Sequence, residues 1–139
     1  MAITSCLTNT FKEELLQGHH SFNASGDTPA GSAFKIALYT SSATLDTTTT
    51  AYTATNEVAN GSGYTTAGEA LTNTGVAKST TTSYTDFSDV SWTSASFTAR
   101  GCMIYNSSTI SGLTTDASVA IIDFGGDKTV SSGTFTIQF

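Results

Sequence analysis

The acidic residues stand at spacings that suggest two kinds of metal chemistry. Asp123-Phe-Gly125 spells the metal-binding triplet of protein kinases. Phosphoryl transfer also needs a glycine-rich loop, a strand lysine and a catalytic-loop motif, and the sequence has none of them. Asp123 with Asp127, or Asp86 with Asp89, could offer oxygens to Ca²⁺, but neither pair has the alternate ligands and closing glutamate of an EF-hand. We therefore expect surface carboxylates or Asx turns.

Histidine and serine chemistry is the next candidate. His19 and His20 are adjacent, so on an extended chain they point to opposite sides, and no Cys-His cluster accompanies them. No Gly-x-Ser-x-Gly elbow is present, and Gly61-Ser-Gly63 lacks the strand-turn-helix context of a phosphate-binding loop. We predict no catalytic, cofactor-binding or metal-binding residue, and we expect a protein that is not an enzyme.

The charge of the chain argues against a nucleic-acid-binding protein. The chain has 139 residues, with 5 Lys and Arg against 11 Asp and Glu, and its formal net charge is -6. Five scattered cations form no basic stripe, so we predict no nucleic-acid partner. No apolar run approaches the roughly 18 residues of a membrane-spanning helix. Hydroxyl residues dominate, yet 38% hydrophobic content predicts a folded core.

The first residues and the cysteines bear on the compartment. Polar and charged residues interrupt the N-terminal segment, which predicts no secretory signal and synthesis in the cytoplasm. Two cysteines, Cys6 and Cys102, are fewer than a disulfide-stapled small fold usually carries. Cys102 lies in the apolar run Gly101-Cys-Met-Ile-Tyr105, so we predict a buried free thiol.

One helix is predicted, over residues 11–18. Its apolar side chains share one helical face: Phe11, Leu15 and Leu16. Asn9 or Thr10 is the expected N-cap, and Gly18 the expected end. Two turns are too short to be stable alone, so the helix must dock on its own sandwich or on a neighbouring subunit.

The rest of the chain favours strands. Residues 34–39 alternate, with Phe34, Ile36 and Leu38 on one face. Further strands are predicted at residues 69–77, 84–92, 97–105, 118–124 and 135–139, separated by turns or loops at 79–83, 106–115 and 125–127. Arg100-Gly101 is a candidate bulge. Residues 40–67 are predicted to be a long loop with short strand-like pieces, held by Tyr52, Val58 and Tyr64.

This spacing predicts an all-β antiparallel sandwich, Ig-like or jelly-roll-like, with about seven or eight strands and one short N-terminal helix. Residues 1–33 would form an arm with the helix and a loop, and residues 34–139 the sandwich, in one compact domain. Trp92 shares its strand parity with Val90, which favours core packing over an exposed sugar-binding platform.

Phrases spread over almost the whole chain carry a resemblance. They read FKEELLQG at residues 11–18 and FKIALYTSS at 34–42, then AYTATNE, GSGY, TARG, IYN and AIIDFG. Together they resemble small β-sandwich virion structural proteins of tailed bacteriophages, of the capsid decoration or cement type. The resemblance implies a module without enzymatic activity that is assembled on a capsid or a tail, and it transfers no ligand residues.

The resulting functional hypothesis is a capsid decoration protein that binds across capsid-subunit junctions on the outer surface of the virion. Its partners would be the major capsid protein, other virion proteins, or further copies of itself. Two alternatives stay open: a neck, tail or fibre component, and a carbohydrate-binding sandwich. The predicted contact residues lie in the helix and the long loop: Phe11, Leu15, Leu16, Tyr52 and Tyr64.

Overall fold

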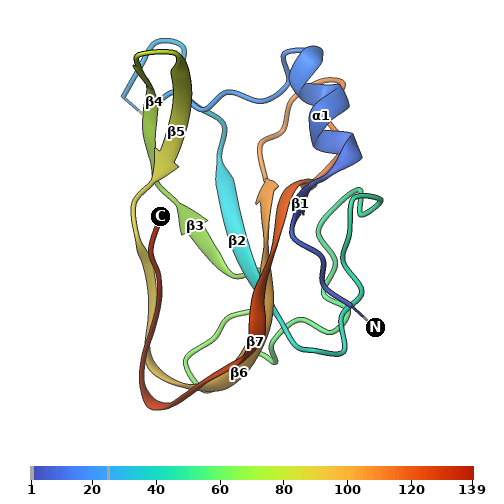
Figure 1. Cartoon of the computed structure of the whole chain (residues 1–139), viewed down its shortest axis with the longest axis vertical. Helices are drawn as coiled ribbons and strands as arrows, with labels where there is room; N and C mark the ends of the chain where they lie inside the picture. The colour runs from blue at the N-terminus through green and yellow to red at the C-terminus, as the bar shows by residue number, and fades with distance from the viewer. Residues whose placement is uncertain (1, 25) are drawn as a thin grey trace.

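The computed structural model describes residues 2–24 and 26–139 (Figure 1). Within them the chain forms seven strands and one helix: β1 (Cys6–Leu7), α1 (Asn9–Leu16), β2 (Phe34–Tyr39), β3 (Glu69–Leu71), β4 (Asn73–Ser79), β5 (Thr82–Phe87), β6 (Val90–Asn106) and β7 (Ala117–Ile137). The pairings are antiparallel, in a five-stranded sheet of order β1-β7-β6-β2-β3 and a two-stranded sheet β4-β5. The predicted all-β sandwich with one short N-terminal helix is confirmed.

The sandwich is built largely by one long hairpin that folds back on itself. Strands β6 and β7 have 17 and 21 residues, and they pair from Asn106↔Ala117 to Val90↔Ile137. Figure 1 shows β7 running down from the sheet, turning at the bottom and rising again to the C-terminus, with β6 alongside it in the opposite direction. We call the half of the hairpin that pairs with β2 the sheet arm, and the half with residues 90–99 and 128–137 the return arm.

The bend between the two arms is a bulge. Ala99 pairs with Lys128 and Gly101 with Asp123, so residues 124–127 of β7 face a single residue of β6. The bulge expected at Arg100-Gly101 is confirmed. The turn expected at residues 125–127 is wrong as a chain reversal, because β7 continues through it. The two glycines there let the strand bend instead.

Strand boundaries differ from the prediction at three other points. The strand expected at 69–77 is divided at Thr72 into β3 and β4, and residues 90–92 belong to β6 rather than to the strand before it. The strands expected at 118–124 and 135–139 are the two ends of β7. In each case the hydrophobic pattern correctly marks extended chain, but the pattern alone does not show whether a strand bends or ends.

Two apolar clusters cover the two faces of β2. Phe34, Ile36 and Leu38 pack between the arms of the hairpin, as their alternation predicts. Ala37 and Tyr39 point the other way and are also fully buried, beneath the segment of residues 40–67. Isolated bridges such as Tyr39↔Glu57 hold that segment to the sheet, which confirms the expected loop with short strand-like pieces.

The N-cap of helix α1 lies one residue before Asn9, the earlier of the two predicted caps. The N-cap is Thr8, whose hydroxyl accepts a hydrogen bond from the backbone N–H of Phe11 at 3.3 Å. Asn9 and Thr10 are therefore wrong as caps, and they lie in the first turn. Thr8 is the N-cap because β1, which precedes it, places it against β7. There its hydroxyl also donates to the Ser118 carbonyl at 2.7 Å.

The helix ends as the sequence predicts. Gly18 has φ +78°, a left-handed conformation that glycine adopts without strain. The Gly18 N–H donates to the Leu15 carbonyl at 3.0 Å, and the His19 N–H donates to the Glu14 carbonyl at 2.9 Å. This pair of bonds is a Schellman motif, which satisfies the last carbonyls and turns the chain sharply toward His20.

Candidate functional site

An apolar groove of about 540 Å³ lies between the two arms of the β6–β7 hairpin. Its apolar lining comes from both arms and from the end of the chain: Cys102, Ile122, Phe124, Phe135, Ile137 and Phe139. Of the described lining residues, Lys128 alone carries a charge. A concave apolar surface with a single cation suits protein contacts better than recognition of a charged small molecule.

The groove depends on the bend of the hairpin. At the bend, the Arg100 guanidinium donates to Asp123 Oδ1 at 2.8 Å, and the same oxygen accepts from the Gly125 N–H at 3.0 Å. The Arg100 hydrogen bond, reinforced by that of Gly125, lowers the pKa of Asp123. Asp123 thus serves as an Asx-turn residue, as expected from the sequence, and it fixes the bulge that separates the two arms.

One edge of β7 is unpaired along most of its length. Up to Ile121 this edge is covered, because β1 pairs with Ala120 and Ile121 and Ala51 bridges to Ala117. Beyond Ile121, no described strand pairs with β7 on the side away from β6. The groove lies between the two arms of the same strand, so the apolar lining and the free backbone groups adjoin.

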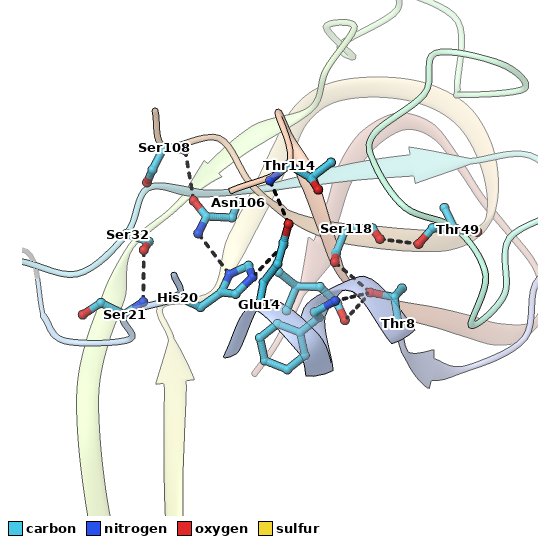
Figure 2. Close-up of polar contacts among 12 residues, drawn as sticks. Thr8, Glu14, His20, Ser21, Ser32, Thr49, Asn106, Ser108, Thr114 and Ser118 are labelled. Carbon is cyan, nitrogen blue, oxygen red and sulfur yellow. Dashed lines mark hydrogen bonds and ion pairs between the residues drawn. The ribbon is translucent and has the colours of Figure 1, made fainter. Parts of the chain in front are cut away.

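A buried polar cluster joins the N-terminal segment to the end of β6 (Figure 2). His20 Nε2 lies 3.2 Å from Glu14 Oε2, and His20 Nδ1 lies 3.0 Å from the side-chain amide nitrogen of Asn106. The other carboxylate oxygen of Glu14 accepts from the Thr114 N–H at 2.7 Å. Two parts of the chain that are distant in sequence, residues 14–20 and residues 106–114, therefore meet at one point, which we call the His20 cluster.

The contacts of His20 specify a neutral ring. Nε2–H donates to Glu14, and the unprotonated Nδ1 accepts from the Asn106 amide, whose oxygen already accepts from the Ser108 N–H. A protonated ring would turn a second donor toward that amide nitrogen. Burial lowers the pKa of His20, against the opposing effect of Glu14. Burial also disfavours ionised Glu14, but hydrogen bonds from Thr114 and His20 bring its pKa below the usual value.

The His20 cluster contains an acid–base pair without access to a substrate. The side chains of His20 and Glu14 are 0% and 6% exposed, and both ring nitrogens of His20 are engaged within the fold. No serine, threonine or cysteine side chain bonds to His20 within the described residues. The cluster therefore acts as a structural tie. No sequence pattern predicts this cluster, because a spacing of six residues across a helix end matches no ligand or catalytic motif.

A second tie lies beside it in Figure 2. Thr8 bonds the Ser118 carbonyl, and the Ser118 hydroxyl donates to the Thr49 carbonyl. Both Thr8 and Ser118 are fully buried. Hydroxyl side chains thereby connect the N-terminal segment, the long loop and β7, which gives part of the abundant Ser and Thr a role inside the fold.

The long loop is held by a carboxylate. Glu57 accepts from the hydroxyls of Tyr64 at 2.6 Å and Tyr52 at 2.7 Å, and from the Ala67 N–H at 2.8 Å. The Tyr64 hydroxyl in turn accepts from the Leu38 N–H at 2.9 Å, in the centre of β2. Burial first, and then the Glu57 carboxylate, raise the pKa of both tyrosines. This Glu57 cluster fixes residues 52–67 against the sheet.

The predicted contact residues fall into three groups by exposure. Phe11 and Tyr64 are 5% and 2% exposed and belong to the core, so within this chain they present no surface to a partner. Tyr52 is half-buried on Tyr105, with ring centroids 4.9 Å apart. Leu15 and Leu16 are 43% and 91% exposed, because the buried face of α1 carries Phe11 and Glu14 instead. The expectation that Leu15 and Leu16 pack on the same buried face as Phe11 is therefore wrong.

Two further sequence predictions concern buried groups. Trp92 is 2% exposed and packs with Tyr64, Phe97 and Phe135, which confirms it as a core residue. Cys102 is a buried free thiol, as expected, and burial raises its pKa to about 12. Cys6 is also free and half-buried.

The remaining candidate chemistry stays dispersed. Among residues 2–24 and 26–139, no group of three or more His, Cys, Asp or Glu could hold a metal ion. In the same described part of the chain, no helix has the length and apolar character needed to cross a bilayer. Comparisons with protein-family models, with curated proteins and with solved structures each found no match to this chain.

Proposed function

We propose that this chain is a non-enzymatic structural protein of a tailed-bacteriophage virion, and that it decorates the capsid. In this role the sandwich sits across junctions between capsid subunits on the outer surface and stabilises the head by protein contacts. The sequence phrases that resemble virion structural proteins support the assignment. Net charge of -6 is compatible with a location away from the packaged nucleic acid.

The observation that carries the proposal is the apolar groove beside the unpaired edge of β7. The groove is lined by Ile122, Phe124 and Phe135, among others, and a folded chain gains by covering such a surface. The return arm of β7 also exposes short hydroxyl side chains such as Ser131 and Thr134, which lose little side-chain entropy when a neighbour packs on them. Leu15 and Leu16 on α1 supply a second exposed apolar site.

The test is the position and copy number of the chain in purified particles. Cryo-electron microscopy of intact virions, together with quantitative mass spectrometry, would give both. A decoration protein is expected on the outer head surface in a copy number comparable with that of the capsid subunit. A chain present only at the neck, tail or fibres would overturn the decoration role and support the alternative virion position.

A particle without the chain would overturn the virion assignment altogether. Binding to isolated heads offers a second measurement, because a decoration protein added to undecorated capsids is expected to bind saturably and to raise their thermal stability. The double variant Leu15→Ser, Leu16→Ser tests the helix contact, and Lys12→Ser is its matched control on an exposed position of the same helix.

A further inference from the structure

We propose that the free edge of β7 pairs with the same edge of a second copy of this chain, antiparallel and about a two-fold axis. This inference rests on the proposed structural role and names one partner for the groove. The paired segment is the return arm of β7, residues 128–137, whose outer backbone groups have no described strand partner.

This edge lacks the charges and prolines that usually protect free strands, although it bulges at Ser132, which has φ +50°. Soluble proteins guard exposed edges with charged side chains, prolines or very short strands. From Thr129 to Phe139 the chain has no charged side chain and no proline, and Val130, Thr134 and Thr136 favour extended backbone. Two copies at net charge -6 repel elsewhere, but along residues 129–137 neither copy has a charged side chain.

The other strand edges fit such a role less well. β1 and β3 have two and three residues, and β3 begins with Glu69. The free strands of the β4–β5 sheet carry Lys78 and Asp86. The outer edge of the return arm of β6 is covered, because the Ser96 N–H donates to the Ser62 carbonyl and Gly63 lies against Ala95.

A two-fold dimer would cover part of the apolar groove as well as pair the free edge of β7. A strand that pairs antiparallel with its own copy satisfies both edges at once, since the same residues serve on both sides. The two return arms then form one continuous sheet whose inner faces lie on the same side. Because the return arm itself lines the groove, a second copy paired with that arm would lie beside Phe135 and would cover part of the apolar lining.

The first test is the mass of the purified chain across a micromolar concentration series, by sedimentation equilibrium. We expect a concentration-dependent shift from the monomer of 14.4 kDa to twice that mass. The double variant Ser131→Lys, Thr134→Lys places like charges along the paired edges, and both positions are exposed. It is expected to raise the dimer dissociation constant at least about tenfold.

The matched control adds the same charge elsewhere. Ala77→Lys with Thr82→Lys changes two exposed residues of the β4–β5 sheet and is expected to dimerise like the unmodified chain. Circular dichroism establishes that each variant folds. Hydrogen exchange supplies a second readout, because amides of residues 128–137 are expected to gain protection as concentration rises and amides of 73–87 are not.

Two results would overturn the dimer. One is a monomer at every concentration, and the other is a dimer whose dissociation constant is unaffected by the Ser131 and Thr134 lysines. Neither result bears on whether the chain is found on the virion, so this inference and the proposed function fail separately. A monomer whose groove is covered only in the particle would assign the edge to another virion protein.

Discussion

His20 Nε2 and Glu14 Oε2 lie 3.2 Å apart, between the loop after α1 and the helix itself, with both side chains shielded from solvent. The contact closes a chain of hydrogen bonds that runs on to Asn106 on one side and Thr114 on the other. Its stability therefore depends on a neutral histidine and an ionised glutamate. Those two states coexist only over part of the pH range.

Stability is expected to fall as the pH drops below about 6.5, the reference pKa of histidine. Burial lowers the pKa of His20 in the folded state, so at mildly acidic pH the unfolded chain binds a proton that the folded chain does not. One such group gives a slope of at most about 1.4 kcal/mol per pH unit. Urea denaturation at a series of pH values measures it.

The variant His20→Gln should flatten this decline between about pH 6.5 and 4.5, whereas His19→Gln, which keeps His20, should retain it. Below that window a second loss is expected in all three proteins. The pKa of Glu14 is lowered in the folded state, so its contribution is present at higher pH and disappears as the pH falls through the folded pKa. Equal slopes for His20→Gln and the unmodified chain would contradict the assignment to His20.

Tyr64→Phe is expected to destabilise the protein by about 1–3 kcal/mol. The hydroxyl accepts from the Leu38 N–H and donates to Glu57, so its removal leaves a buried backbone donor without a partner. Tyr84→Phe is the control, because Tyr84 is 52% exposed on β5. Thermal denaturation followed by circular dichroism compares them, and an unchanged midpoint for Tyr64→Phe would show that the Glu57 cluster does not hold the loop.

Gly101→Ala is expected to be destabilising, because a Cβ there would lie 2.5 Å from the Ile122 carbonyl oxygen and 3.0 Å from Ile3. The backbone contact cannot move without opening the hairpin at its bend, a cost of about 1–3 kcal/mol. At Gly126 nothing lies within 4 Å of such an atom, so Gly126→Ala should be neutral or stabilising by up to about 1 kcal/mol. Equal effects of the two substitutions would argue against the close packing at the bend.

The two thiols are expected to react differently with a water-soluble disulfide reagent. Cys102 is fully buried with a pKa near 12, whereas Cys6 is half-buried, so only Cys6 should react in the folded protein. Both should react in denaturant. The variant Cys6→Ser isolates Cys102, and rapid labelling of that variant under native conditions would mean that the groove side of Cys102 opens to solvent.

Local patterns made much of the fold predictable. Alternation identified residues 34–39 as a strand, and the position of Gly18 identified the helix end, because both depend on neighbours in sequence. The course of β7 was harder. Its two ends were visible as apolar segments, but Gly125 and Gly126 suit a turn and a bend equally, and the choice depends on whether β6 bulges opposite them.

The His20 and Glu57 clusters were not predictable in the same way. Glu14 faces inward because its carboxylate accepts hydrogen bonds from His20 and from the Thr114 N–H. Thr114 lies 100 residues beyond Glu14 in the chain, so no local pattern reveals this contact. A helix of two turns has little stability of its own, so its tertiary contacts determine which face packs on the sheet. The contact of Glu14 turns that residue inward and leaves Leu15 and Leu16 exposed. Likewise, the role of Glu57 depends on Tyr52, Tyr64 and the loop that brings them together.

The tie between Thr8 and Ser118 also bears on the order of folding. Its partners are 110 residues apart, and the residues that pair between β1 and β7 lie even further apart in sequence, whereas the β6–β7 hairpin closes over a short connection. During synthesis the N-terminal segment emerges first, yet its docking surface is among the last parts of the chain to be made. Phe11 thus remains uncovered until the hairpin is complete, which makes this segment the natural place for a chaperone to act.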